Sequence, residues 1–498
     1  MATKKATKTA KKPTKKATTK KATKAAISSK NLSVRVRMYR QGLGDCFLLT
    51  FSKGRDKFNM LIDCGVLQGT VNAGALMTEI VNHVHEETDG HLNLVLATHE
   101  HWDHISGFAQ ARDAFDEITF DTIWLGWTED QNNKLARLVK KHQEQRRAAL
   151  KQALTRMSSA RLSPLRDSIN DLLEFEGPLA ATGKVSKQSA WDFLVKDKEA
   201  DRNYCRPGQL LRLDGMEGVR VYVLGPPEDE TLLRRSAPRK GSDEVYEQSF
   251  GMTLENHFFA AVAQNGADDD LDSLSYPFDS HYGIRQQDAK NDPFFQEFYG
   301  FSKGGDAWRR IDDDWLSVAG ELALNLDSDT NNTCLAIAIE LVESGKVLLF
   351  PGDAQVGNWL SWENLVWRVT DTDGRRRTVR AKDLLARTVL YKVGHHGSHN
   401  ATLREKGLEL MESQDLVALI PVSEAMAKKQ RWNHMPLKSL VKRLKEKTRG
   451  RLLRIDMKGS DISRLRTEAL KYMSDAEWNR FQKATNADRL YIEHTVSG

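Results

Sequence analysis

The chain has 498 residues, of which 40% are hydrophobic and 29% charged, and its formal net charge is +6. This length allows two or three domains, or one domain with large insertions. No run of about 18 apolar residues predicts a membrane span, and the N-terminus lacks the apolar segment of a secretory signal. The four cysteines lack C-x-x-C spacing, so we expect reduced thiols in a cytoplasmic protein.

The positive charge belongs to the first 30 residues, which hold 11 lysines and no acidic residue. The lysine pairs include Lys11, Lys12, Lys15, Lys16, Lys20 and Lys21. Without this tract, 63 basic residues face 68 acidic ones, a formal charge of −5. A segment so poor in apolar residues is predicted to be a disordered tail. Its composition favours a nucleic-acid-binding arm that acts by counterion release, with a solubilising extension as the alternative.

The first half of the globular part begins with strands and continues with alternating strands and helices. Apolar and polar residues alternate over 33–40, as in a half-buried strand. The next predicted elements are strands at 46–51 and 59–65, a helix at 71–86, a strand at 92–97, a helix at 107–117 and a strand at 123–125. This order is typical of an α/β layered fold.

Two insertions interrupt the second half. Residues 129–208 are charged and helical in period, and residues 228–329 are acidic with mixed character. Between and after them we expect strands at 219–224, 334–339 and 347–350, a helix and strand at 381–393, strands at 416–422 and 452–455, and a basic helix at 437–447. Residues 458–498 are predicted to form a C-terminal helical extension.

The most informative segment is Thr98-His99-Glu100-His101-Trp102-Asp103-His104, directly after the apolar run 92–97. A buried strand that ends in such a loop delivers its polar side chains to one edge of a sheet. His99 and His101, two residues apart in extended chain, face the same way and can share one metal ion. Asp103 and His104 can reach a second ion beside it. The segment therefore predicts a metal centre rather than a solvated polar loop.

Five further polar motifs accompany this loop. They are Gly42-Leu43-Gly44-Asp45, Ile62-Asp63-Cys64-Gly65, Asn331-Asn332-Thr333, Gly352-Asp353 and His395-His396-Gly397-Ser398. Together with residues 98–104, called the His loop below, they resemble the metallo-β-lactamase superfamily. More narrowly, they resemble the branch of the ComEC competence-protein hydrolase domain and a phosphorylcholine esterase. Asn433-His434-Met435-Pro436 is similar to a further segment of that branch. The resemblance covers about residues 33–127, 209–227 and 330–457.

The resemblance implies an αβ/βα sandwich over residues 31–457, with the two insertions, and a centre of two divalent ions, Zn²⁺ or Mn²⁺. The expected metal ligands are His99, His101, Asp103, His104, Asp353 and His396. Asp353 is the candidate bridge, because two ions about 3.5–4 Å apart share a carboxylate. His395 is then expected to face the substrate, and either His395 or Asp103 to manage protons.

One departure from the superfamily concerns the first ion, which most members bind with a further histidine. The candidates here, His257 and His281, lie in the second insertion and at no predicted strand end. A first site that is open or weaker is therefore expected, as in the esterase branch.

Several other residues are assigned to the surroundings of the metals or to the substrate, each with a structural alternative. Asp63 either orients a metal-bound histidine or caps a turn. Asp45 and Asn332 either approach the site or satisfy backbone groups. Ser398, His399 and His434 are candidates for substrate contacts, although surface imidazoles are the commoner case.

The expected activity is metal-dependent hydrolysis of a phosphodiester, with DNA or RNA as the leading substrate because of the lysine tail. One alternative is a small-molecule phosphodiesterase or another ester hydrolase, and a second is a non-catalytic interaction module stabilised by metal. The large insertions suggest, by analogy alone, an effector of bacterial antiviral defence that a regulatory protein partner restrains. No membrane partner is expected.

Overall fold

The structure is a computed structural model that describes most of the chain from residue 32 to residue 498. The described residues are 32–156, 166–167, 169–170, 173, 185–235, 284, 286–299, 326–327, 329–371, 373–429, 432 and 435–498. The predicted lysine tail, His257, His281 and His434 lie outside them. Among the described residues, no helix is both long and apolar enough to cross a membrane.

The first sheet contains eight strands in the described part of the chain. Their spatial order is β16 (Thr485–Ala487), β17 (Tyr491–Ser497), β1 (Ser33–Tyr39), β2 (Cys46–Lys53), β3 (Asp56–Cys64), β4 (His91–Leu96), β5 (Thr119–Gly126) and β6 (Asp201–Cys205). Pairing is antiparallel from β16 to β3 and parallel from β3 to β6. The segments that follow the parallel strands therefore meet at one edge, where ligands bind in open α/β sheets.

The second sheet has the same division into an antiparallel and a parallel half. Its order, within the described residues, is β15 (Leu452–Arg454), β14 (Val417–Ile420), β13 (Thr388–Lys392), β10 (Lys346–Phe350), β9 (Ile337–Leu341), β8 (Val219–Val223) and β7 (Leu210–Leu211). Strands β10, β13, β14 and β15 are parallel to one another. A separate hairpin joins β11 (Val366–Thr370) to β12 (Arg376–Arg380).

One apolar core lies between the two sheets. The predicted alternation of β1 places Val34 and Val36 in it. Phe47 of β2 lies in the same core, and Ile339 and Phe350 enter it from the other sheet. The rings of Phe47 and Phe350 meet edge to face with centroids 5.7 Å apart. Each such large side chain stabilises the fold by about 1.5–3 kcal/mol. Sheet-on-sheet packing is thus the centre of the molecule.

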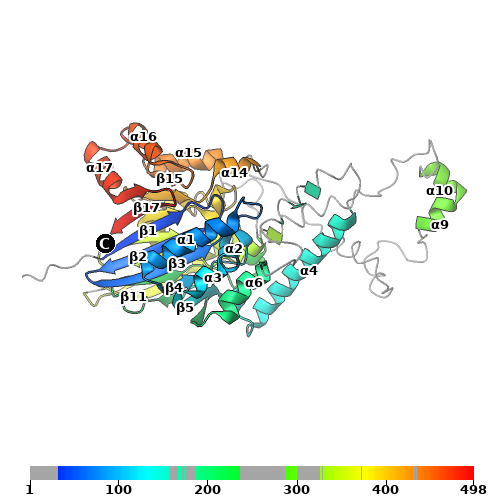
Figure 1. The fold of residues 1–498 in the computed structure, drawn as a ribbon, viewed down its shortest axis with the longest axis horizontal. Helices are drawn as coiled ribbons and strands as arrows, with labels where there is room; N and C mark the ends of the chain where they lie inside the picture. Colours follow the sequence, from blue (N-terminus) through cyan, green and yellow to red (C-terminus); the bar gives the residue numbers. More distant parts are fainter. Residues whose placement is uncertain are drawn as a thin grey trace, which may run out of the picture.

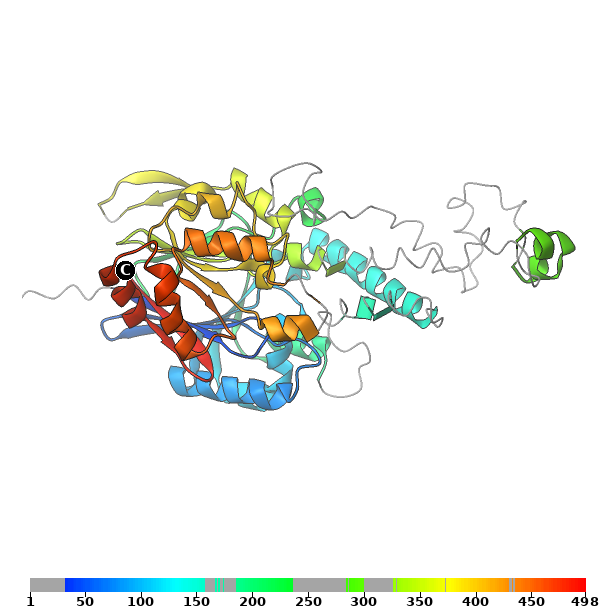
Figure 2. The same cartoon turned by 90° about the horizontal axis from the view of Figure 1, so that it is seen from above.

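Helices cover the outer face of each sheet (Figure 2). On the first sheet lie α1 (Ala73–Thr88), α2 (Trp102–Gln110), α3 (Arg112–Asp116) and α6 (Lys187–Asp192). On the second lie α12 (Val356–Ser361), α13 (Ala381–Ala386), α14 (Glu424–Lys429) and α15 (Lys438–Lys447). The resulting order of layers is helices, sheet, sheet and helices. A mixed α/β layered fold is thus confirmed.

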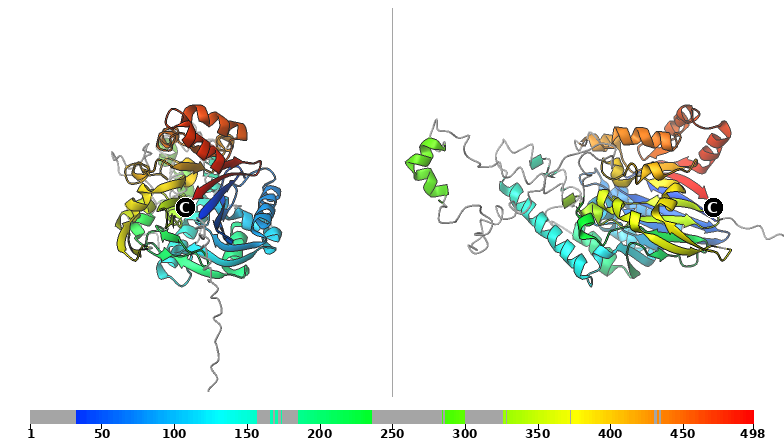
Figure 3. Two further views of the ribbon diagram at one scale, coloured as in Figure 1. Left: turned by 90° about the vertical axis from the view of Figure 1, so that its left-hand side faces the viewer. Right: turned by 180° about the vertical axis from the view of Figure 1, so that it is seen from behind.

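The helical part of the first insertion, α4 (Lys134–Arg156), projects from one end of the sheets (Figure 1). The short helix α7 (Glu230–Leu233) packs against α12. The remaining described part of the second insertion includes α9 (Gln286–Asn291) and α10 (Pro293–Phe298), drawn apart from the sheets (Figure 3).

The structure differs from the sequence predictions at three places. The helix expected at 107–117 begins at Trp102 and is split into α2 and α3, so Asp103 and His104 lie on a helix and not in a loop. The insertion expected to be helical contains β6, which pairs with β5. The C-terminal extension contains α16 (Gly459–Ala469) and α17 (Asp475–Ala484), but also β16 and β17. Because β17 pairs with β1 along its whole length, this extension is part of the first sheet.

Candidate metal centre

The predicted site residues come from strand ends of both sheets. Asp63 is the next-to-last residue of β3, the His loop runs from the end of β4 into the first turn of α2, Asp353 follows β10, and His395 and His396 follow β13. Asp45 lies in the turn between β1 and β2. Since the sheets pack face to face with these ends at the same side, side chains far apart in sequence meet at one buried point.

Two glycines allow this convergence. Gly44 has φ +134°, and a Cβ on it would lie 2.6 Å from the Asp103 carbonyl oxygen. A Cβ on Gly65 would lie 2.3 Å from the Asp103 backbone carbon. The Asp45 N–H donates to the Asp103 carbonyl over 3.0 Å. The Gly-x-Gly-Asp and Asp-x-Gly motifs therefore permit close backbone approach to the start of α2.

Four buried residues form a group that could hold a metal ion: Asp45, His104, Asp353 and His396, whose ligand atoms all lie within 4.8 Å of one another. His104 Nε2 is 3.0 Å from Asp353 Oδ2, and His396 Nε2 is 3.6 Å from the same oxygen. Asp103 belongs to the same point, because its Oδ2 is 2.8 Å from His396 Nε2 and 3.7 Å from His104 Nε2.

Hydrogen bonds select one nitrogen of each histidine. The His104 Nδ1–H donates to Asp63 Oδ2 over 2.7 Å, and the His396 Nδ1–H donates to the Pro421 carbonyl over 3.0 Å. Their Nε2 atoms therefore carry the lone pairs that point towards Asp103 and Asp353. Two carboxylates and two imidazole lone pairs at these distances repel unless a proton or a metal cation lies between them. This donor set suits zinc or another transition metal.

Asp45 lies on the Nδ1 side of the two histidines. Its oxygens are 3.8 Å from His104 Nδ1 and 3.8 Å from His396 Nδ1, which already have hydrogen-bond partners. We therefore regard Asp103 as a better fourth ligand than Asp45, although Asp45 also lies within 4.8 Å of the other three ligands. Asp45 instead lies next to the Nδ1 atoms of the two histidines and pairs with Lys392, as residues that surround metal ligands do.

His99 and His101 lie beside this point. The rings of His99 and His101 have centroids 4.6 Å apart, and those of His99 and His104 are 4.3 Å apart. Thr98 Oγ1 donates to Asp63, so it accepts from His99 Nδ1–H over 3.0 Å. His99 Nε2 and Asp103 Oδ1 are buried and have no hydrogen-bond partner among the described residues. Buried polar atoms of this kind are rare unless a bound ion or water completes them.

Electrostatics matches these roles. Burial lowers the pKa of His99 well below its usual value, helped by His104 and His101, so its imidazole is neutral. Burial alone would favour neutral His104, but Asp353, Asp103 and Asp45 outweigh it and raise the pKa of His104 well above the usual value. Burial opposes ionisation of Asp353 as well, yet His104 and Lys392 hold its pKa well below the ordinary range. Asp353 is thus ionised, as a metal ligand must be.

Lys392 is a buried residue of this group that the sequence analysis missed. Its ammonium is buried and lies 2.5 Å from Asp45 Oδ2, 2.9 Å from Asp353 Oδ1 and 2.8 Å from the Gly352 carbonyl oxygen. Desolvation is outweighed by Asp353 and Asp45, which raise the pKa of Lys392. The available signal was a lysine at the end of the fully buried strand β13. Lys392 occupies Oδ1 of Asp353, so Oδ2 is the oxygen left for a metal.

Asp327 is a second missed residue. Its Oδ1 is 4.0 Å from His101 Nε2, and its Oδ2 accepts a hydrogen bond from Asn331 over 3.2 Å. It comes from the end of the second insertion, where a further ligand of the first ion was sought among histidines. A carboxylate therefore approaches His101, at the first site, which was expected to be open or weaker.

Of the remaining predicted residues, His395 lies next to the centre and Asn332 does not. His395 is buried, with Nδ1 3.0 Å from Ser398 Oγ, and its backbone N–H donates to Asp353 Oδ1 over 3.1 Å. Asn332 faces the protein instead: its amide accepts from the Asn358 N–H and donates to the Arg235 carbonyl. That arrangement matches the backbone-satisfying alternative for Asn332. His399 is half-buried.

Backbone strain is concentrated at the centre. Asp63, His395 and His396 have φ values of 54°, 40° and 51°, a left-handed region that non-glycine residues rarely adopt. Such conformations persist where the surrounding structure enforces them, often at functional sites.

Comparison of the chain with protein-family models gives no matching family, and comparison with curated proteins gives no match.

Proposed function

We propose that this chain is a metal-dependent hydrolase of the metallo-β-lactamase type that cleaves phosphodiester bonds, with DNA or RNA as the leading substrate. The observation that carries the proposal is the convergence of two imidazole Nε2 atoms on Asp103 and Asp353 within 2.8–3.7 Å. The layered αβ/βα arrangement and the order of the motifs also support this superfamily.

The positions of these residues suggest which of them would hold each of two metal ions. Asp103, His104, Asp353 and His396 would hold one, and His99 and His101 the other, with Asp327 as a carboxylate near His101. When bound, such ions supply Lewis acidity and lower the pKa of a coordinated water to about 7. Lys392 fixes the orientation of Asp353, and Asp63 fixes that of His104.

His395 has a different task. Burial lowers its pKa to about 3, so its imidazole is neutral at pH 7. A neutral imidazole donates or accepts a hydrogen bond but is a poor general acid. We therefore assign to His395 the positioning of a substrate phosphate oxygen. Proton transfer then falls to Asp103, whose carboxylate lies between His104 and His396.

A phosphodiester is favoured over a lactam because negative charge develops on its non-bridging oxygens during hydrolysis, and a centre of two metal ions and imidazoles suits that charge. The lysine tail adds a reason to favour nucleic acid over a small diester.

The test compares substrates on one purified protein supplied with Mn²⁺ or Zn²⁺. We expect cleavage of bis-(p-nitrophenyl) phosphate and of DNA or RNA, no turnover of nitrocefin, and loss of hydrolysis in Asp353→Ala. Faster turnover of nitrocefin or of a lactone than of any phosphodiester would refute the substrate class. Full activity in Asp353→Ala would refute the metal mechanism.

A further inference from the structure

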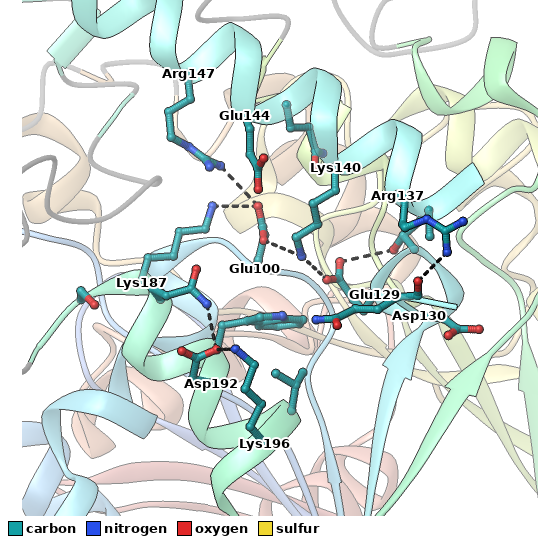
Figure 4. Close-up of a pocket in the computed structure, with 18 of the residues that line it drawn as sticks. Glu100, Glu129, Asp130, Arg137, Lys140, Glu144, Arg147, Lys187, Asp192 and Lys196 are labelled. Carbon is teal, nitrogen blue, oxygen red and sulfur yellow. Dashed lines mark hydrogen bonds and ion pairs between the residues drawn. The ribbon is translucent and has the colours of Figure 1, made fainter. Parts of the chain in front are cut away.

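Glu100 turns away from the metal centre although it lies between two of its candidate ligands. Its carboxylate is buried beneath α4 and α6, and Figure 4 shows three cationic side chains pointing at it. Lys187 Nζ is 2.9 Å from it, Lys140 Nζ is 3.0 Å and an Arg147 nitrogen is 3.3 Å away. Three ion pairs thus connect the helical insertion to the His loop at Glu100.

The residues around Glu100 carry charges of both signs, with a small excess of cations. The described residues that line the cavity next to Glu100 include six cationic side chains and five carboxylates. Glu129 pairs with Lys140, and Glu144 lies beside Arg147 and Glu100 (Figure 4). Burial raises the pKa of Glu129 despite Lys140. Glu100 is the carboxylate that contacts all three of these cations, Lys140, Arg147 and Lys187.

A cavity of about 400 Å³ opens onto these groups. Its lining includes Glu100, Lys140, Arg147, Lys187 and Trp191. Lys140 Nζ lies 5.0 Å from the centre of the Trp191 ring. Pockets that bind small molecules and cofactors have volumes of about 300–1,000 Å³. The space is therefore sufficient for a phosphate group and for the nucleoside attached to it.

We propose that this cavity is a phosphate-binding site, in which Glu100 holds the cations when no ligand is bound. A guanidinium and two ammonium groups from two helices match the oxygens of a phosphate, which accept charge-assisted hydrogen bonds. A phosphate that enters shares Arg147 and Lys187 with Glu100. Because His99 and His101 flank Glu100, occupancy of the cavity changes how the His loop is anchored.

The site does not depend on the proposed hydrolysis, since binding is measurable on the metal-free protein. Calorimetric titration of the full chain after chelation, in chloride buffer, would use inorganic phosphate, a nucleoside monophosphate and a short single-stranded oligonucleotide. We expect binding of all three. Stronger binding of the monophosphate would assign a base contact next to the phosphate, and stronger binding of the oligonucleotide would make the cavity part of a strand-binding path.

Substitutions of the cations and of Glu100 should change phosphate affinity in opposite directions. Arg147→Ala and Lys187→Met should weaken phosphate binding roughly tenfold or more, the effect of losing one charge-assisted hydrogen bond. Glu100→Gln should strengthen it, because the cations lose their competitor. Lys406→Ala, at an exposed pair with Glu363 on another surface, should change nothing.

Folding of each variant would be checked by thermal unfolding, and Arg147→Lys would replace Arg147→Ala if the latter is unfolded. Arg147→Lys keeps the charge but loses the planar fork, so binding should weaken by less than in Arg147→Ala. The proposal is wrong if neither the native chain nor Glu100→Gln binds any of the three probes. It is equally wrong if the changes at Arg147 and Lys187 leave binding as it is.

Discussion

The two sides of the His loop solve the problem of buried charge in different ways. Towards α4 and α6, Glu100 is surrounded by three cations of the protein itself. Towards the sheets, Asp103, Asp353, His104 and His396 converge, and Lys392 is the cation that contacts this group in the described part of the chain. A buried anion must be paired. The Glu100 carboxylate is therefore neutralised by cations of the protein itself, whereas the group on the other side has more carboxylates than Lys392 alone can neutralise, which leaves a place for protons or metal ions.

The largest effect on hydrolysis should come from replacing each of the two adjacent histidines in turn with alanine. His396→Ala removes an Nε2 that faces Asp103 and Asp353, so it should lose bound metal and abolish hydrolysis. His395→Ala removes a neutral ring outside this group, so it should slow turnover of bis-(p-nitrophenyl) phosphate while metal content stays near that of the native chain. Elemental analysis and rate measurements on the pair check this. The reverse pattern would show that the two roles are interchanged.

A substitution of Lys392 should show how much of the charge of Asp45 and Asp353 is neutralised by this ammonium and how much by a bound metal ion. Lys392→Met leaves Asp45 and Asp353 buried without their ammonium, which should lower the free energy of unfolding of the metal-free protein by about 3–5 kcal/mol. The same change should strengthen metal binding, since the centre becomes more negative. Denaturant unfolding with and without Zn²⁺ measures both effects.

Lys406→Met is the control for Lys392→Met, because it removes a lysine from an exposed ion pair and should alter stability by at most about 0.5 kcal/mol. If Lys392→Met were as mild as this control, the buried ion pairs of Lys392 would contribute nothing to the centre.

The pH dependence of metal affinity should show that protons occupy the histidine nitrogens when no metal is bound. The pKa of His104 is raised well above its ordinary value and that of His396 is also raised, so in the metal-free protein both rings keep their second proton to a higher pH than an ordinary histidine does. A metal ion takes the lone pair of each nitrogen, so binding releases protons and affinity rises with pH until the raised pKa values are passed. The sign for metal-free stability is opposite. The contribution of protonated His104 is complete below about pH 6.5 and is lost as the pH rises through the folded pKa.

Titration calorimetry of Zn²⁺ binding in two buffers of different ionisation enthalpy counts these protons. We expect release at pH 7. Equal heats in both buffers would mean that the Nε2 atoms are not protonated before the metal binds.

The smallest effect on catalysis should follow removal of residues 1–30. If their lysines bind phosphates, the slope of log K against log salt for duplex binding should become shallower by up to about 0.9 for each phosphate that is no longer neutralised. Turnover of a small diester should barely change. An unchanged slope would assign the tail to solubility instead.

The strand ends could be predicted from the sequence because apolar runs there stop at polar motifs. Asp45, His104, Asp353 and His396 were singled out because their motifs also resemble those of a known superfamily, and the structure places their ligand atoms within 4.8 Å of one another. Lys392 could not be recognised in the same way, because a lysine at a strand end is usually exposed. Its burial depends on how the two sheets meet. The partners of Glu100 lie 40 or more positions further along the chain, in helices whose docking no local pattern reveals.

The missed strands have a different cause. β17 alternates buried Ile492, His494 and Val496 with more exposed residues, so its period was present in the sequence. It was overlooked because a polar helical stretch precedes it. In β6 the sequence Asp-Arg-Asn-Tyr-Cys has no apolar alternation, and its pairing with β5 makes it a strand. Tertiary pairing overrides weak local preference there.

The most direct test of the central claim is anomalous diffraction from crystals grown with Zn²⁺, recorded at the zinc edge. A peak bounded by the Nε2 atoms of His104 and His396, Asp103 and Asp353 Oδ2 is the expected result, with a second peak beside His99 and His101 if both sites fill. A fully ordered centre without a peak, and with Lys392 still bridging Asp45 and Asp353, would contradict the assignment of this cluster as a metal centre.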